Sequence, residues 1–169
     1  MTLPHKPGHL VAPIKRDGSL FAYTDDGKTI QLWDVATCLP VAQLKGHSAR
    51  VSVVVFSPDK MLIVSGDEQG VIIIWMHIHT FPSRSLLFGG KSPPCFSPSA
   101  TAIVTSSSDY SLLRWDSGKS QLVGEPWRGH QGPIVSIVFQ TDGQVLSLSK
   151  DRTICTWDFE SGQQKRGPI

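Results

Sequence analysis

Three side chains in the last third of the sequence have the types that a serine hydrolase uses: His130, Ser147 and Asp151. In such an enzyme the histidine takes a proton from the serine hydroxyl, while the carboxylate orients the imidazole. The same three types also form hydrogen-bonded chains that only satisfy buried polar groups. A catalytic serine needs an open cleft and an oxyanion hole, so the surrounding elements decide between the two interpretations.

The other residues with site chemistry are isolated. His77 and His79 alternate on an expected strand and could face one way as metal ligands, but no third ligand is nearby. Residues 88–91, Phe-Gly-Gly-Lys, lack the spacing of a phosphate-binding loop. Asp25 and Asp26 precede a glycine in an expected turn, and a calcium loop would need more carboxylates. We therefore predict no catalytic, metal-ligating or cofactor-binding residue, and no cofactor.

The composition describes one turn-rich domain. The chain has 169 residues, 16 basic against 14 acidic, and a formal charge of +2, which favours neither nucleic acid nor a membrane as partner. Only 18% of the residues are charged, while Gly numbers 15 and Pro 12, which argues against a helical bundle or coiled coil. The longest apolar run, residues 71–76, is too short to cross a bilayer, and the first residues do not resemble a secretory signal.

The cysteines indicate the compartment. Cys38, Cys95 and Cys155 are odd in number and widely spaced, which is typical of reduced thiols and not of a disulfide framework. We therefore expect an intracellular protein, either cytoplasmic or nuclear.

An internal repeat explains most of the sequence. Trp33, Trp75, Trp115 and Trp157 are separated by 42, 40 and 42 residues, and three of them are followed by Asp. Phe-Ser-Pro-Asp at 56–59 recurs as Phe-Ser-Pro-Ser at 96–99 and, weakened, at 139–142. Gly-His at 46–47 recurs at 129–130. Three markers in one order at one period define a repeat of about 40 residues.

Each repeat contains short strands and turns. Residues 51–56 and 71–75 are rich in β-branched side chains, and the segments between them contain Gly, Asp and Pro. No window of helical length shows a period of 3.6 with capping residues. Several strands are apolar on both faces, and a lone meander cannot bury two faces. The repeats must therefore stack against each other.

The order of these markers resembles the WD40-repeat family, in which Gly-His lies near the start of a repeat and Trp-Asp near its end. The resemblance implies an all-β fold, a β-propeller with one four-stranded blade per repeat. It covers the whole chain as a single WD-repeat domain, residues 1–169, with repeats at about 1–44, 45–86, 87–126 and 127–169. The linker at 124–130 also resembles linkers in the WD-repeat arrays of large fungal signalling proteins.

The resemblance also implies a buried tetrad in each blade. A tryptophan indole bonds a serine or threonine hydroxyl, the hydroxyl bonds a histidine, and an aspartate fixes the histidine tautomer. Counted from the tryptophan, the fourth repeat has the whole set: His130, Ser147, Asp151 and Trp157. The tetrad therefore accounts for the triad-like residues as blade scaffolding, with the serine hydroxyl held by the indole.

The other repeats keep part of the tetrad. In the second, Gln69 stands at the aspartate position, and in the third, Leu87 stands at the histidine position. In the first, Tyr23 and Gly27 replace the hydroxyl and the carboxylate. The members that remain are His47, Ser65 and Trp75 in the second repeat, Thr105, Asp109 and Trp115 in the third, and His5 and Trp33 in the first.

A partner would bind on one rim of the propeller. In the WD-repeat pattern, the Gly-His loops and the turns with the tetrad aspartate lie on the same rim. Arg50 and Tyr110 are the leading candidates there, because arginine and tyrosine are enriched in interface hot spots. The whole expected rim set is Arg50, Glu68, Ser108, Tyr110, Gln131, Lys150 and Arg152. Its mixed charges predict no strong preference for an acidic or a basic ligand.

Four repeats do not make a seven-bladed ring. If each blade spans about 51°, four cover about 206° and leave two open faces. The chain is then part of a longer array, half of an eight-bladed ring made by two copies, or a truncated product. We predict a non-enzymatic scaffold that binds other proteins or further WD repeats, and neither nucleic acid nor membrane. The alternatives are a propeller enzyme with a site in the central channel and a non-functional fragment.

Overall fold

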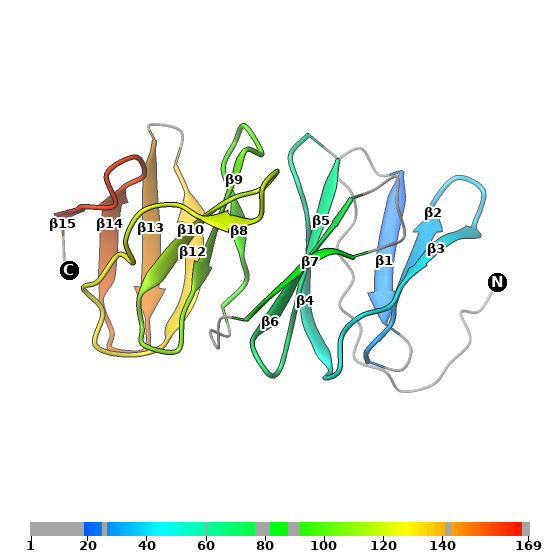
Figure 1. Ribbon diagram of the computed structural model, residues 1–169, viewed down its shortest axis with the longest axis horizontal. Helices are drawn as coiled ribbons and strands as arrows, with labels where there is room; N and C mark the ends of the chain where they lie inside the picture. Colours follow the sequence, from blue (N-terminus) through cyan, green and yellow to red (C-terminus); the bar gives the residue numbers. More distant parts are fainter. Residues whose placement is uncertain are drawn as a thin grey trace. The chain divides into compact units, whose positions relative to one another are not determined.

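The computed structural model describes residues 19–24, 27–59, 61–76, 82–87, 92–140 and 143–166, and for residues 82–87 it gives only the backbone strand. Every regular element in these residues is a β-strand, and the strands pair as antiparallel sheets (Figure 1). The predicted all-β class, with consecutive meanders as blades of a partial propeller, is confirmed. His5, the turn at 25–26, His77, His79 and residues 88–91 lie outside the described residues.

The first compact unit contains strands β1 to β6 and most of β7, as far as Ser85. Within the described residues, three strands form its first sheet and four form its second, in chain order. The strands are β1 (Leu20–Thr24), β2 (Ile30–Asp34) and β3 (Leu39–Leu44), then β4 (Val51–Phe56), β5 (Leu62–Asp67), β6 (Val71–Met76) and β7 (Pro82–Leu87). The two sheets share one buried core, to which Ala22 and Leu32 contribute from one sheet and Ile63 and Trp75 from the other.

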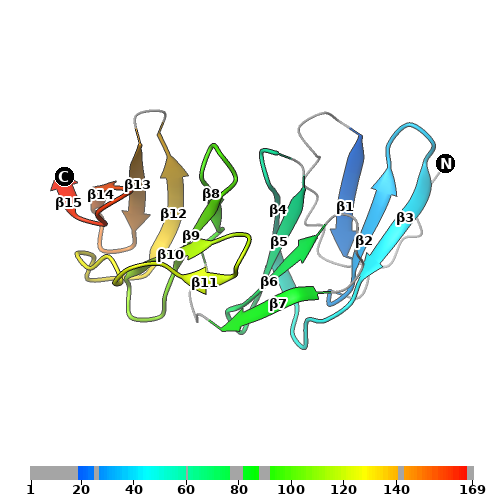
Figure 2. The same ribbon diagram turned by 45° about the horizontal axis from the view of Figure 1, so that its top comes forward.

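The second compact unit contains strands β8 to β15 in two four-stranded sheets (Figure 2). The strands are β8 (Cys95–Phe96), β9 (Ala102–Ser106), β10 (Leu112–Asp116) and β11 (Gln121–Leu122), then β12 (Ile134–Phe139), β13 (Gln144–Ser149), β14 (Ile154–Asp158) and β15 (Gln164–Arg166). Val104 and Leu112 from one sheet pack with Ile137, Val145 and Trp157 from the other in a single core.

The aspartate that follows three of the tryptophans shapes the next turn. Asp34 Oδ1 accepts hydrogen bonds from the Thr37 backbone and hydroxyl at 2.7 and 2.8 Å. Asp116 Oδ1 accepts the backbone N–H groups of residues 118 and 119, and Asp158 Oδ1 accepts the backbone and hydroxyl of Ser161. Such side-chain acceptors replace backbone partners in turns. The Trp-Asp pair therefore joins an indole, buried in the third and fourth repeats and half-buried in the first, to the turn that reverses the chain.

The fifth tryptophan, Trp127, belongs to the core of unit 2 although it lies outside the named strands. Its backbone exchanges two hydrogen bonds with Leu112, of 2.9 and 3.0 Å. Its ring stacks on Trp157 at a centroid distance of 6.1 Å and meets the edge of Phe159 at 6.4 Å. A Cβ on Gly162, which has a φ of +69°, would lie 2.2 Å from the Trp127 indole nitrogen. Both the conformation and the close approach require glycine there.

One face of the β12–β15 sheet presents apolar side chains to solvent. Val138 pairs with Leu146 across β12 and β13, and Leu148 pairs with Ile154 across β13 and β14, so the four lie on one face. Val138 is 52% exposed and Ile154 is 44% exposed. This face carries the type of side chain that the opposite face of the sheet buries in the core of unit 2.

Candidate functional site

The tetrad residues of the fourth repeat lie within hydrogen-bond distance of one another. The Trp157 indole N–H donates to Ser147 Oγ at 2.7 Å, and His130 Nε2 lies 2.7 Å from the same oxygen. His130 Nδ1 lies 3.2 Å from Asp151 Oδ2. Ser147 is 1% exposed and the His130 side chain is 0% exposed. The hydroxyl is therefore enclosed and occupied by two partners, so the arrangement satisfies buried polar groups and offers no nucleophile to a substrate.

Thr153 is a further member of this network. Its hydroxyl donates to Asp151 Oδ1 at 2.6 Å and lies 2.9 Å from His130 Nδ1. Burial raises the pKa of Asp151, but bonds from Thr153, from the Gln131 backbone and from His130 outweigh it and hold that pKa well below its usual range. The sequence offered no signal for Thr153, because its position in the second repeat is Val71.

The second repeat holds a complete tetrad, although counting positions from its tryptophan predicted that the aspartate is absent. Ser65 Oγ lies 2.8 Å from the Trp75 indole nitrogen and 2.6 Å from His47 Nε2. His47 Nδ1 lies 2.8 Å from Asp67 Oδ2, and both side chains are 0% exposed. Burial lowers the pKa of His47, and the Asp67 carboxylate partly offsets that effect. The aspartate is therefore present in this repeat.

Asp67, and not Gln69, takes the carboxylate position. Asp67 lies two residues after the tetrad serine at the end of β5, whereas Asp151 lies four residues after Ser147 in a turn. Asp67 Oδ1 accepts hydrogen bonds from the backbone N–H groups of Gln69 and Val71, each at 3.0 Å. Gln69 is exposed, and its side-chain oxygen lies 3.4 Å from Ser48 Oγ. Counting a fixed number of residues back from the tryptophan pointed to the wrong side chain.

The third repeat keeps only the indole–hydroxyl part. The Trp115 indole donates to Thr105 Oγ1 at 3.0 Å. Asp109 turns away from it and accepts the Ser111 hydroxyl at 2.6 Å, and Arg128 lies 2.8 Å from its second oxygen. Hydrogen bonds from Ser111 lower the pKa of Asp109 strongly, and Arg128 adds to the effect.

The first repeat uses an aromatic contact at the corresponding place. The Tyr23 ring lies 6.3 Å from the Trp33 ring and 5.6 Å from the Phe21 ring, measured between centroids. Tyr23 is 8% exposed. A ring contact with Tyr23 therefore stands where the complete tetrads have a hydroxyl bonded to the indole.

The residues predicted for the binding rim are all exposed. Unit 1 contributes Arg50 and Glu68, whose backbones are joined by a hydrogen bond of 2.9 Å. Unit 2 contributes the other five, namely Ser108, Tyr110, Gln131, Lys150 and Arg152. Most of them lie beside tetrad residues, whereas Ser108 and Tyr110 flank Asp109, which forms no tetrad.

A pocket of about 240 Å³ lies among the rim residues of unit 2. Its walls include the predicted residues Tyr110 and Gln131 and the Asp109–Arg128 ion pair. His130, whose side chain is fully buried, also lines the pocket. Lys150 and Arg152 stand exposed on the turn that holds Asp151. The pocket thus offers hydrogen-bonding groups of both charges, as mixed-charge protein contacts do.

Two rim residues have an unusual backbone. Tyr110 and Arg152 have φ values of 68° and 70° and occupy the same position, five residues before the tryptophan. In the second repeat this position is Gly70, with φ 81°. The left-handed conformation disfavours any side chain by about 1–2 kcal/mol. Unit 2 therefore holds a tyrosine and an arginine where glycine would fit with less strain.

The described residues offer little support for other kinds of site. Among them, no group of three His, Cys, Asp or Glu side chains is placed to hold a metal ion. No helix in the same residues is long and apolar enough to span a membrane.

Comparison with known families identifies the repeats. Residues 38–76 and 120–158 match the WD40 model, described as "WD domain, G-beta repeat". These two stretches end one residue after the tryptophans of the second and fourth repeats, which are the repeats with complete tetrads.

The chain is similar in sequence to proteins named nuclear distribution protein PAC1. The chain is 32% identical over 166 residues to the nuclear distribution protein PAC1 of Coccidioides posadasii, covering 84% of this chain and 35% of that protein. It is 29% identical over 168 residues to the PAC1 protein of Arthroderma otae, covering 84% and 36%. The chain thus spans about a third of the length of these relatives. The repeat matches, the four antiparallel sheets and the two buried tetrads together show that the chain belongs to the WD40-repeat family.

Proposed function

We propose that the chain is a non-enzymatic scaffold that binds partner proteins through the turns beside its tetrads. The main binding surface is the unit 2 rim, which we define as Asp109, Tyr110, Arg128, Gln131, Lys150 and Arg152. WD40 repeats and the similarity to PAC1 proteins support a scaffold role. The pocket within this rim supports its location.

The observation that carries the proposal is the left-handed backbone at Tyr110 and Arg152. Strained residues of this kind are enriched at ligand-binding sites. Cys38, Ala100 and Ser120 have the same type of backbone outside the rim, and what sets Tyr110 and Arg152 apart is a large, exposed side chain. Both side chains are exposed, so core packing does not explain them. Tyrosine and arginine are also the types that most often dominate binding energy at interfaces.

The serines of the two triad-like sets, Ser65 and Ser147, are both buried, which supports a non-enzymatic role. Ser147 Oγ is bonded by both an indole and an imidazole, and its residue is buried. A nucleophile would need an open approach to that oxygen. We further propose an intracellular location, which the three free cysteines support.

The proposal is tested by replacing the strained residues with glycine. Tyr110→Gly and Arg152→Gly should each stabilise the chain by about 0.5–1 kcal/mol, since strain is relieved while glycine costs some entropy. The same variants should reduce capture of partner proteins by the immobilised chain from an extract of its source organism. Denaturation curves and quantitative mass spectrometry measure the two effects.

Ser120→Gly is the matched control. Ser120 also has a left-handed backbone, with φ 53°, but lies in the turn after β10, at the other end of that strand from the rim. Its replacement should relieve the same strain and leave capture unchanged. Capture by the two rim variants equal to that of the parent chain would refute the rim as the binding surface.

A further inference from the structure

Arg114 breaks the pattern of its position in the repeat. The residue before the tryptophan is Leu32 in the first repeat and Ile74 in the second, exposed by only 3% and 1%. In the third repeat it is Arg114, whose side chain is 18% exposed. In the fourth repeat it is Thr156, which is uncharged and partly buried. A charged group where the other three repeats hold uncharged residues is a candidate functional residue.

The guanidinium of Arg114 is held on one side only. Its Nη1 lies 3.0 Å from the Phe159 carbonyl oxygen, 3.3 Å from the Glu160 carbonyl oxygen and 3.1 Å from Glu160 Oε2. Its central carbon lies 4.0 Å from the Phe159 ring centroid. These contacts fix the plane of the guanidinium in advance of any ligand, which lowers the entropy cost of binding.

The other edge of the guanidinium has no partner. Nε is buried and makes no hydrogen bond, and among the described residues nothing bonds Nη2. Nε and Nη2 together form the edge that accepts a carboxylate with two parallel bonds. A buried donor without a partner costs about 1–3 kcal/mol, so an arriving acceptor would recover that free energy.

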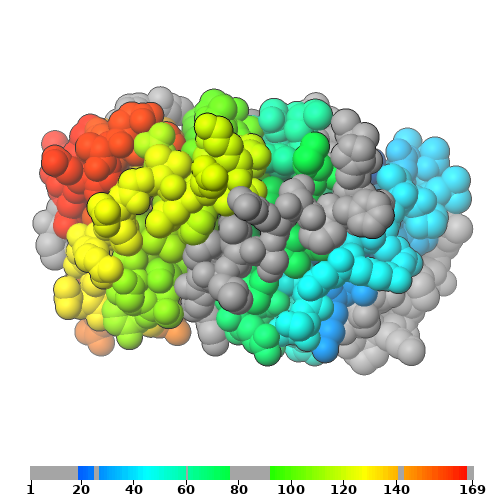
Figure 3. All heavy atoms as spheres, viewed as in Figure 1, coloured from blue at the N-terminus to red at the C-terminus, as the bar shows by residue number. Residues whose placement is uncertain are grey.

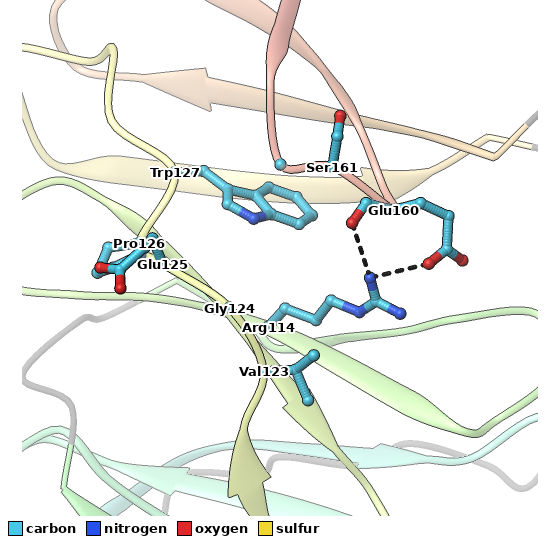
Figure 4. A pocket seen from close by; sticks show the side chains of 9 residues that line it. Arg114, Val123, Gly124, Glu125, Pro126, Trp127, Glu160 and Ser161 are labelled. Atoms are coloured by element: carbon cyan, nitrogen blue, oxygen red, sulfur yellow. Dashed lines mark hydrogen bonds and ion pairs between the residues drawn. The ribbon is translucent and has the colours of Figure 1, made fainter.

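A pocket of about 240 Å³ lies beside this guanidinium (Figure 4). Val123 pairs with Arg114 through the backbone and Trp127 pairs with Leu112, while the residues between them, at 124–126, loop away from β10. The loop follows β11 and is drawn in yellow at the surface of unit 2 (Figure 3). The pocket walls are Val123, Pro126 and Trp127 on one side and the turn at 160–162 on the other.

We propose that this pocket binds a carboxylate of a partner peptide on the Nε–Nη2 edge of Arg114, with apolar parts of the peptide against Val123, Pro126 and Trp127. Glu160 shows the chemistry that the guanidinium selects, but its side chain is 78% exposed and contacts only Nη1. The Glu125 carboxylate lies at the far end of the pocket from the guanidinium (Figure 4). The site lies at the β14–β15 turn, at the opposite end of β14 from the unit 2 rim, and is independent of the function proposed for that rim.

The test follows the Arg114 Nε–H signal in proton–nitrogen spectra of the whole chain during peptide titrations. The first probe is a short capped peptide with one glutamate between leucines, and its control has glutamine instead. A third probe has no acidic side chain but a free carboxyl terminus. A shift of the Nε–H signal with the first or the third probe, and none with the control, supports the proposal and identifies the source of the carboxylate. Equal binding of the glutamine peptide, or no binding of either acidic probe, overturns it.

Two variants separate binding from a structural role of Arg114. Arg114→Lys keeps the charge but loses the two-donor edge, so affinity for the acidic probe should fall by at least about tenfold. Glu160→Gln removes a competing carboxylate and should raise affinity about two- to fivefold. Arg128→Lys, on the unit 2 rim, is the matched control and should have no effect. A weaker affinity in Glu160→Gln, or an unchanged one in Arg114→Lys, contradicts the proposal.

Discussion

The tetrads of the second and fourth repeats reach the same chemistry by different routes. In the second, Asp67 at the end of β5 is fully enclosed and bonds His47 at 2.8 Å. In the fourth, Asp151 comes from a turn, is 12% exposed and lies 3.2 Å from His130, with Thr153 closer to the imidazole. The repeat therefore constrains where the carboxylate stands in space and not which residue supplies it.

The largest loss of stability is expected from removing Asp67, the carboxylate of the second tetrad. Asp67→Ala should destabilise the chain by about 3–5 kcal/mol, because the substitution leaves a buried imidazole and two backbone N–H groups without their acceptor. Urea denaturation measures the loss. Gln69→Ala is the control and should change stability by less than about 0.5 kcal/mol. The opposite ranking of the two variants would return the carboxylate role to position 69.

Removing the histidine of the other tetrad should have a smaller effect. His130→Ala should cost about 2–3 kcal/mol, since Ser147 loses one partner while Asp151 keeps Thr153 and some solvent. Denaturation curves of the variant and the parent chain measure this difference in the free energy of unfolding. Superimposable curves would mean that the network does not contribute to stability.

Thr153 allows the two tetrads to be made alike. Thr153→Val gives the fourth repeat the residue that the second has at position 71, and both backbone N–H groups already bond the tetrad carboxylate. We expect a loss of about 1.5 kcal/mol, the lower end of the range for one side-chain hydrogen bond to a charged acceptor. The reverse change, Val71→Thr, should not stabilise the second repeat, because Asp67 Oδ1 already has two donors. Equal responses at both positions would show that Thr153 has no special role.

The smallest expected effect is a change of stability with pH in the unsubstituted chain. Burial lowers the pKa of His47 below its ordinary 6.5. Below pH 6.5 the unfolded chain then binds more protons than the folded one, so unit 1 loses stability as the pH falls. The pKa of Asp151 lies below its ordinary 3.8, so its stabilising contribution is present above that pH and is lost below it.

Amide hydrogen exchange, corrected for intrinsic rates, measures this difference. Opening free energies of β5 should fall between pH 6.5 and pH 3.8, while the contribution of Asp151 to those of β13 persists over that window. A loss in β13 as large as that in β5 would contradict the assignment of the transition to His47.

The sequence predicted the elements better than the contacts. The spacing of the four tryptophans and the β-branched runs predicted the all-β repeats, because such patterns reflect local geometry and burial. Asp67 was missed because a carboxylate two residues away can reach the same imidazole. Trp127 and Arg114 carry no repeat signal, since Trp127 pairs with Leu112 of the preceding repeat and Arg114 packs on Phe159 of the following one. Contacts between repeats depend on tertiary packing, which a local pattern does not encode.

The position of Trp127 has a consequence for how the chain can be divided. Trp127 stands at the start of the fourth repeat, and its backbone is hydrogen-bonded to Leu112 in β10. Its indole packs on Trp157 and Phe159. Neither sheet of unit 2 has a complete hydrophobic core without residues of the other. The smallest autonomous folding block there is a pair of repeats, and truncations cut at the nominal boundary near residue 126 should yield two incompletely folded pieces in place of two domains.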